Sequence, residues 1–278
     1  MSLPGTALNR PTNPKGLQTQ LYRRQYQQSN SRFPEHKPLH YHRVQSNLNS
    51  VYPLAPKSLH FCDDESVIGS RFHIIERRRG FVIRKEFEPY ISPSKDNLRK
   101  LSFKIIDVLS DLHKINPDEV GLGDLGRPDG FVLRQLNGWE ERWERSTEDK
   151  VLKSKFDKLI TFLRSTIPQP QAVTILHNDF KLDNIMWSNS NPFDPVAVFD
   201  WDMCTRGDPL MDLGHMLNYW IDETDDEDCK LITSMPVTTI SYPIYCNIIF
   251  SHVERIPFID PHIELFIKPF ILVFSSSS

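Results

Sequence analysis

Three stretches of the chain repeat apolar residues at steps of three and four, which is the spacing of a helix that buries one face. They cover residues 94–114, 147–165 and 211–221. The first is the most regular, and Ser94 stands before it as an N-terminal cap. Its apolar residues are Leu98, Leu101, Ile105, Val108, Leu109 and Leu112. We predict amphipathic helices in all three, with the first in the core and His113 near its end in a packing or capping role.

Short apolar runs rich in β-branched residues predict strands. Three of them, residues 172–176, 185–187 and 195–199, lie between the second and third predicted helices. The segment that separates the last two runs is rich in Ser, Asn, Asp and Pro, which favours a turn. We therefore predict a hairpin that brings Asn184, just before the second run, next to Asp200, just after the third.

The first third of the chain carries weaker patterns. Residues 72–76 alternate enough for a strand, and residues 80–83 predict a second strand or an extended linker. Gly5 and Gly16 are the only glycines before Gly69, so no glycine-rich loop is apparent. Helices and strands together predict an α+β fold.

Composition is that of a globular protein, with 39% hydrophobic and 25% charged residues in a chain of 278. We expect one domain of two lobes, or two small domains. The formal net charge of −3 gives no overall attraction for nucleic acid or an anionic membrane. Residues 263–274 are apolar, but this run is shorter than a membrane span. We expect neither a nucleic-acid nor a membrane partner, and the oligomeric state stays open.

Cysteine usage and the N-terminal composition bear on the cellular compartment. The cysteines lack paired metal-binding spacing and no secretory signal is apparent, so we expect reduced thiols. They are Cys62, Cys204, Cys229 and Cys246. The first 34 residues contain no Asp or Glu, which is typical of an organelle transit peptide or of a disordered leader. We expect an intracellular protein, cytoplasmic in the first place, with mitochondrial and peroxisomal locations as alternatives.

A cluster of polar side chains follows the strand predicted at residues 172–176. Asp179 and Asn184 are five positions apart there, and Asp200 ends the third predicted strand. Kinases use this spacing for the Asp that takes the proton of the acceptor hydroxyl and for two magnesium ligands. Two oxygen ligands suit Mg²⁺, which keeps much of its water. Lys181 adds a cation that can neutralise the transferred phosphoryl group.

Each of these residues taken alone would be an ordinary solvated turn residue, so the prediction depends on their combination. A metal-dependent phosphoesterase could instead use a ligand set of His177, Asp179, Asp200 and Asp202. Lys181 and Asn184 fit a nucleotide site better than they fit that set. The phosphotransferase is the leading hypothesis, and the phosphoesterase is the alternative.

These motifs resemble the aminoglycoside phosphotransferase family, a kinase-like group that includes choline-kinase-type enzymes. The likeness is to the branch whose domains are often found beside acyl-CoA dehydrogenases, and it spans about residues 51–237. It rests on residues 62–69, 75–80, 121–128, 177–184, 200–202 and 207–213. It implies a protein-kinase-like fold of two lobes, with a reduced N-lobe up to about residue 80 and an incomplete helical C-lobe. Residues 1–50 would then be poorly ordered or degenerate, and residues 238–278 an atypical tail.

The resemblance also implies roles by position. Asp179 would orient or deprotonate the acceptor hydroxyl, and Lys181 would neutralise charge beside it. Asn184 and Asp200 would bind Mg²⁺ that bridges the phosphates of ATP. Glu76 falls in the segment that resembles the hinge of the family and would contribute to nucleotide binding.

Further positions carry supporting roles in the same resemblance. Lys37 would be the lysine that grips the phosphates, and His40 stands where the family has the glutamate that pairs with it. His177 would hold the catalytic loop by packing and hydrogen bonding. Asp208 and Asp212 would brace that loop or cap the helix that follows.

The sequence therefore predicts an ATP- and Mg²⁺-dependent phosphotransferase that acts on a hydroxyl of a small molecule. The alternative is a degenerate or truncated kinase-like protein with a non-catalytic binding role, which the missing glycine-rich loop favours. The acceptor stays open among aminoglycosides, choline-like amines, sugars and hydroxyacyl-CoA compounds.

Overall fold

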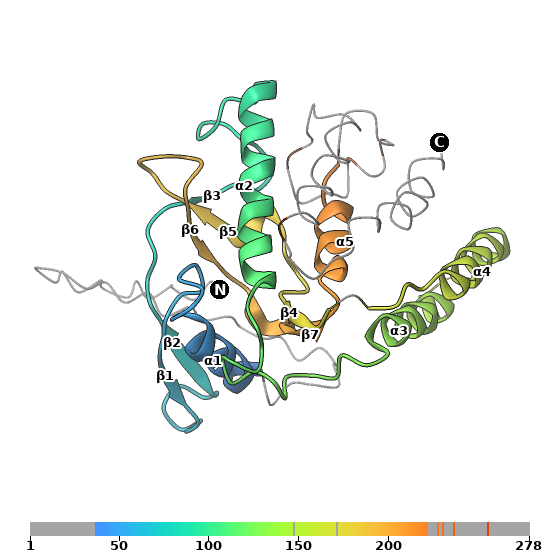
Figure 1. The fold of residues 1–278 in the computed structure, drawn as a ribbon, viewed down its shortest axis with the longest axis horizontal. Coiled ribbons are helices and arrows are strands. Elements are labelled where there is room, and N and C mark those ends of the chain that lie inside the picture. The colour runs from blue at the N-terminus through green and yellow to red at the C-terminus, as the bar shows by residue number, and fades with distance from the viewer. Residues whose placement is uncertain are drawn as a thin grey trace, which may run out of the picture. The chain divides into compact units, whose positions relative to one another are not determined.

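The computed structural model describes residues 37–146, 148–170 and 172–221, and the single residues 227, 230, 236 and 255. All of them belong to the compact unit Phe33–Ser278. The acid-free leader, the tail from residue 238 except residue 255, Cys229 and Cys246 lie outside the described residues. Figure 1 shows how the elements follow one another.

The N-terminal elements are one helix and a two-stranded antiparallel sheet. Helix α1 (Lys37–Leu48) packs against strands β1 (Ser58–Cys62) and β2 (Phe72–Ile75). The ring of His42 stacks on that of Phe61, with centroids 5.6 Å apart. Strand β2 confirms the strand predicted in this part of the chain.

Helix α1 falls in a segment that we expected to be poorly ordered or degenerate up to residue 50. Its apolar face is short, because Val44 and Leu48 are fully buried while the equally buried Gln45 is polar. So few apolar positions give too weak a periodic signal for a prediction. The rest of that expectation, for residues 1–36, lies outside the described residues.

Helix α2 (Lys95–His113) lies in the core, as its apolar spacing predicted. The Ser94 side chain caps it by accepting a hydrogen bond from the amide of Asn97. Every apolar residue of the predicted stripe is at most 2% exposed. Burying a side chain of this size contributes roughly 1.5–3 kcal/mol, so α2 anchors the hydrophobic core.

Three further strands form a second antiparallel sheet. It has the order β3 (Phe81–Val82), β5 (Ile185–Trp187), β6 (Pro195–Val198). Strands β5 and β6 confirm the predicted hairpin. The residue before β3 is Gly80, and a side chain would not fit there. An added Cβ would lie 2.2 Å from the carbonyl oxygen of Trp187.

A second pair of strands frames the candidate site. Strand β4 (Thr174–Leu176) pairs antiparallel with β7 (Thr205–Gly207), which leads into helix α5 (Leu210–Asn218). Short 3₁₀ turns at Leu182–Asn184 and Trp201–Met203 complete the connections. Strand β4 confirms the strand predicted at residues 172–176, and α5 confirms the helix predicted at residues 211–221. The helix ends at Asn218 rather than at residue 221.

Helices α3 (Phe131–Ser146) and α4 (Lys150–Ser165) pack against each other. The rings of Trp143 and Phe156 stack between them, with centroids 4.5 Å apart. Helix α4 begins later than the apolar pattern predicted, because Asp149 acts as its cap and accepts hydrogen bonds from the first amides.

Cys62 and Cys204 are free thiols, as expected for a reduced protein. Burial raises the pKa of Cys204, so this thiol stays protonated and acts as a packing residue. Within the part of the chain that the structure describes, no helix has the length and apolar character of a membrane span.

Candidate active site

The loop that leaves β4 begins with His177, which is fully buried. Its Nε2 lies 2.8 Å from the carbonyl oxygen of Phe199, and its Nδ1 accepts the amide of Asp179 at 3.3 Å. The imidazole is therefore neutral with its proton on Nε2, and burial lowers its pKa. Both ring nitrogens are engaged, which confirms that His177 holds the loop and leaves no nitrogen for the metal-ligand set of a phosphoesterase.

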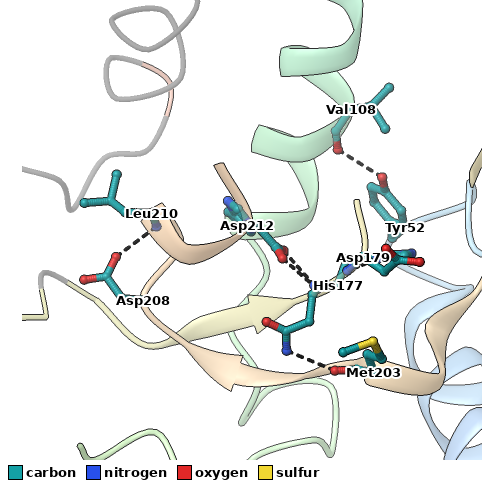
Figure 2. A network of polar contacts seen from close by, with 10 residues as sticks. Tyr52, Val108, His177, Asp179, Met203, Asp208, Leu210 and Asp212 are labelled. Carbon is teal, nitrogen blue, oxygen red and sulfur yellow. Dashed lines mark hydrogen bonds and ion pairs between the residues drawn. The ribbon is translucent and has the colours of Figure 1, made fainter. Parts of the chain in front are cut away.

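Asp212 of helix α5 anchors this loop through its carboxylate (Figure 2). Its carboxylate accepts the amides of His177 and Asn178, each at 2.6 Å, and lies 3.1 Å from Nε2 of His113. Burial alone would raise the pKa of Asp212, but the hydrogen bond and charge of His113 and the loop amides outweigh it and lower the pKa. The predicted bracing role of Asp212 is confirmed. His113 joins the same network, which sequence reasoning did not find.

Asp179, Lys181 and Asn184 form one connected cluster. Nζ of Lys181 lies 3.0 Å from one carboxylate oxygen of Asp179. The side-chain amide of Asn184 donates to the other carboxylate oxygen at 3.0 Å and to the Asp179 carbonyl at 2.8 Å. Burial alone would lower the pKa of Lys181, but the Asp179 carboxylate raises it, so Lys181 stays a cation. Both carboxylate oxygens of Asp179 are thus held, one by Lys181 and one by Asn184.

The β5–β6 hairpin brings the backbone before Asp200 next to Asn184. Ile185 pairs with Val198, and the amide of Phe199 donates to the carbonyl oxygen of Asn184 at 2.8 Å. Asp200 follows directly, so Asn184 and the Asp200 turn are neighbours, as the hairpin predicted. Asp200 has left-handed backbone angles, with φ 68° and ψ 54°.

The donor set suits a magnesium ion. The amide nitrogen of Asn184 is committed to Asp179, so its amide oxygen is the atom that could face a cation. Together with the carboxylate of Asp200 this gives two oxygen ligands, which leaves room for phosphate oxygens and water. Among the described residues no group of three or more His, Cys, Asp or Glu could hold a metal on its own. A closed, all-protein metal site is therefore not what these residues form.

Glu76 follows β2 and lies in a tightly bonded segment. Its amide donates to the Lys57 carbonyl at 2.8 Å, and its carboxylate lies 2.9 Å from Nη2 of Arg78. Arg78 also donates to the carbonyls of Pro53 and Val196. The Glu76 side chain therefore helps, through Arg78, to fix the segment after β2 against Pro53 and Val196.

Lys37 is the first residue of helix α1, whereas the lysine that grips phosphates in kinases lies on a strand. His40 is half-buried and hydrogen-bonds to the backbone of Cys204, and burial lowers its pKa. It thus faces the turn after Asp200. Within the described residues, no lysine–glutamate pair of the kinase type lies at this position.

Three further acids, Asp208, Asp202 and Asp183, lie in the segments that carry the candidate site residues. Asp208 accepts the amide of Leu210 at 2.9 Å and so caps α5, as predicted. Asp202 is half-buried in the short turn after Asp200. Asp183 stands beside Asn184, and one of its carboxylate oxygens is buried without a hydrogen-bond partner in the described structure. Burial raises the pKa of Asp183. No pattern in the sequence marked this residue.

The chain is similar to proteins of a known family. A model of the phosphotransferase enzyme family matches residues 29–229. Acyl-CoA dehydrogenase family member 11 of Rattus norvegicus is 31% identical over 175 residues, which cover 63% of this chain and 22% of that protein. The chain therefore spans about a fifth of the length of this relative.

Solved structures share the fold. A protein from Ralstonia eutropha, provisionally named an aminoglycoside phosphotransferase, is 26% identical, with a TM-score of 0.60 over 78% of this chain and 74% of that one. The complex of an APH(2") enzyme with GDP and kanamycin is 12% identical, with a TM-score of 0.59 over 86% and 73% of the two chains. This second likeness concerns the fold alone.

The family match begins upstream of the boundary at residue 51 that we expected, and it takes in helix α1. It covers most of the chain, and the solved structures agree with it in fold. The chain belongs to the phosphotransferase enzyme family, with the protein-kinase-like α+β fold of the aminoglycoside phosphotransferases.

Proposed function

We propose that the chain transfers the terminal phosphoryl group of ATP to a hydroxyl of a small molecule and requires Mg²⁺. The observation that carries this proposal is the cluster of Asp179, Lys181 and Asn184, connected at 2.8–3.0 Å, with the Asp200 turn beside it. Such a cluster combines a base, a cation and oxygen ligands within one loop and one hairpin. Phosphoryl transfer needs these groups and little else from the protein.

In the proposed reaction Asp179 orients the acceptor hydroxyl and accepts its proton. The hydroxyl oxygen bonds to the γ-phosphorus as the bond from that phosphorus to the β–γ bridging oxygen breaks, and ADP leaves with the electron pair. General-base help of this kind is worth roughly 10²–10⁴-fold in rate. Lys181, kept cationic by Asp179, balances the charge of the phosphoryl oxygens.

Asn184 and Asp200 would hold the Mg²⁺ through oxygen atoms. The bound ion would neutralise charge on the phosphates of the nucleotide. Glu76 and Lys37 are the candidates for contact with the nucleotide itself, Glu76 through the backbone of its segment and Lys37 from the start of α1.

A non-catalytic role is the second candidate, and one observation favours it. His40, which by the family resemblance stands at the position of the pairing glutamate, hydrogen-bonds to the backbone of Cys204. A member of the family without the lysine–glutamate clamp could bind a ligand without turning it over. The relative from Rattus norvegicus is much longer than this chain, which matches 22% of it. The activity of that relative is therefore not assigned to this chain.

Thermal unfolding with and without millimolar Mg²⁺ and ATP tests the proposal, with GTP as a parallel arm. A ligand that binds the folded state raises its stability by mass action, so the melting temperature should rise. Asp200→Ala should abolish the rise, whereas Asp179→Asn should keep it.

Asp194→Ala is the matched control, because Asp194 is an exposed acid at the other end of the same hairpin. It should keep the full rise. A wild-type chain without any shift, or an equal shift in the wild type and in Asp200→Ala, would contradict the proposed site.

A further inference from the structure

The Asp200 turn is held by a side chain from helix α1. The hydroxyl oxygen of Tyr41 accepts the backbone amide of Asp200 at 2.8 Å, across 159 positions of sequence. The backbone of Trp201 makes a second hydrogen bond to the same side chain. Burial raises the pKa of Tyr41 to about 12, so the hydroxyl stays neutral at physiological pH.

The position of Tyr41 is itself fixed. Its ring lies against that of His73 in β2, with centroids 4.7 Å apart. Two residues after Tyr41 in α1, Arg43 forms an ion pair with Asp124 and donates to the carbonyl of Gly121 at 3.2 Å. The helix is therefore connected both to the N-terminal sheet and to the loop beyond α2, and it presents Tyr41 to the Asp200 turn.

The backbone of Asp200 needs such support. Asp200 and Asn178 are the non-glycine residues with positive φ in the described chain, at 68° and 60°. This region is sparsely populated by residues with a side chain and persists where the surroundings fix it. Asp212 fixes Asn178 through its amide. The hydroxyl of Tyr41 is the corresponding contact at Asp200.

We propose that Tyr41 is a positioning residue for metal binding. By holding the amide of Asp200 it sets the strained backbone from which the Asp200 carboxylate reaches the divalent cation. Helix α1 thereby sets the affinity of the metal site without touching the metal. This inference rests on the proposed function, since it assigns Asp200 to the cation.

A purely structural hydroxyl would act differently. Tyr52 offers the comparison, because its ring also packs on Trp201, with centroids 6.0 Å apart, but its buried hydroxyl donates to the carbonyl of Val108 at 2.9 Å. Tyr52→Phe removes one buried hydrogen bond and lowers stability. Tyr41→Phe removes the hydrogen bonds that hold the Asp200 and Trp201 backbone, so metal affinity separates the two variants.

The experiment is an electron paramagnetic resonance titration of Mn²⁺ with a non-hydrolysable ATP analogue, on the wild type, Tyr41→Phe and Tyr52→Phe. Loss of the hydrogen bond to the Asp200 amide predicts Mn²⁺ affinity weaker by about three- to tenfold in Tyr41→Phe. Tyr52→Phe should bind like the wild type. Hydrogen exchange of the Asp200 amide, measured without metal, should become faster in Tyr41→Phe alone.

The outcomes separate this inference from the proposed function. Unchanged Mn²⁺ affinity and unchanged exchange in Tyr41→Phe, with normal binding by the wild type, would overturn the inference and leave the proposed function standing. Equal weakening in both tyrosine variants would also overturn it, because the effect would then be one of general stability. A wild-type chain that does not bind Mn²⁺ with the analogue would overturn the proposed function, and the role of Tyr41 with it.

Discussion

The two strained turns of the candidate site are held by different chemistry. A buried carboxylate, that of Asp212, holds the Asn178 turn and is connected to α2 through His113. A neutral hydroxyl, that of Tyr41, holds the Asp200 turn. The loop of Asn178 and Asp179 is therefore fixed by charge within the C-terminal part of the chain, whereas the Asp200 turn is fixed by one tyrosine from the N-terminal helix. The first turn should be rigid and the second adjustable.

The difference can be expressed in free energy. Removing one partner from a buried charged network costs about 3–5 kcal/mol, because the remaining groups stay buried and unpaired. Removing one neutral hydrogen bond costs about 0.5–1.5 kcal/mol. The loop of Asp179 is thus expected to keep its conformation in variants that already loosen the turn of Asp200.

The largest effect should come from the base on the rigid side. Asp179→Asn keeps the size of the side chain but cannot accept the hydroxyl proton. Once an acceptor is found, turnover should fall by roughly 10²–10⁴-fold while the nucleotide-induced rise in melting temperature is kept. Steady-state kinetics beside thermal unfolding measure both. Wild-type turnover in this variant would remove the assignment of the base.

Stability should respond next, and unequally, to two neighbouring acids. Asp212→Ala removes the buried anchor and should lower the free energy of unfolding by about 3–5 kcal/mol in denaturant titrations. Asp208→Ala removes the cap of α5 and should cost about 1 kcal/mol. If both variants lose the same amount, Asp212 is not the anchor of the loop.

The anchor also gives a pH dependence with a definite sign. The pKa of Asp212 is lower in the folded chain than its ordinary value of 3.8. Its stabilisation is therefore present above that value and is lost as the pH falls below it. Asp212→Asn should lose this part of the acid sensitivity, while the wild type keeps it. Denaturant titrations between neutral pH and pH values below about 4 give the two slopes, and parallel curves would argue against an ionised anchor.

The smallest expected effect is a gain in stability from a substitution in helix α1. Gln45 of α1 is fully buried, and neither side-chain polar atom has a hydrogen-bond partner in the described structure. Gln45→Met keeps the volume and removes the buried amide, so it should raise the free energy of unfolding by about 1 kcal/mol. Gln135→Met, at a half-buried position of α3, is the control and should change little. A loss of stability in Gln45→Met would show that the amide is satisfied by water or another group.

Local signals in the sequence were sufficient for the C-terminal side. The apolar spacing predicted α2, and the β-branched runs predicted β4, β5 and β6, because periodicity is a property of neighbouring residues. The hairpin then followed, and with it the closeness of Asn184 to the Asp200 turn. The role of Asp212 as a brace of the loop or a cap of the next helix was implied by the family resemblance and not by local spacing.

The remaining contacts join residues that are distant in sequence. His113 meets Asp212 across 99 positions, and Tyr41 meets Asp200 across 159. No periodic pattern encodes such a pair in a single sequence. The buried oxygen of Asp183 was equally hidden, because burial depends on packing from several elements. The roles of Glu76 and Lys37 stay predictions.

A crystal structure with Mg²⁺ and a non-hydrolysable ATP analogue tests the proposed site most directly. We predict a cation at about 2.1 Å from the amide oxygen of Asn184 and from the carboxylate of Asp200, with phosphate oxygens and water as its other ligands. Asp179 should face the open side of the γ-phosphate. A nucleotide whose metal contacts neither Asn184 nor Asp200, or an Asp179 carboxylate turned away from the γ-phosphate, would contradict the proposal.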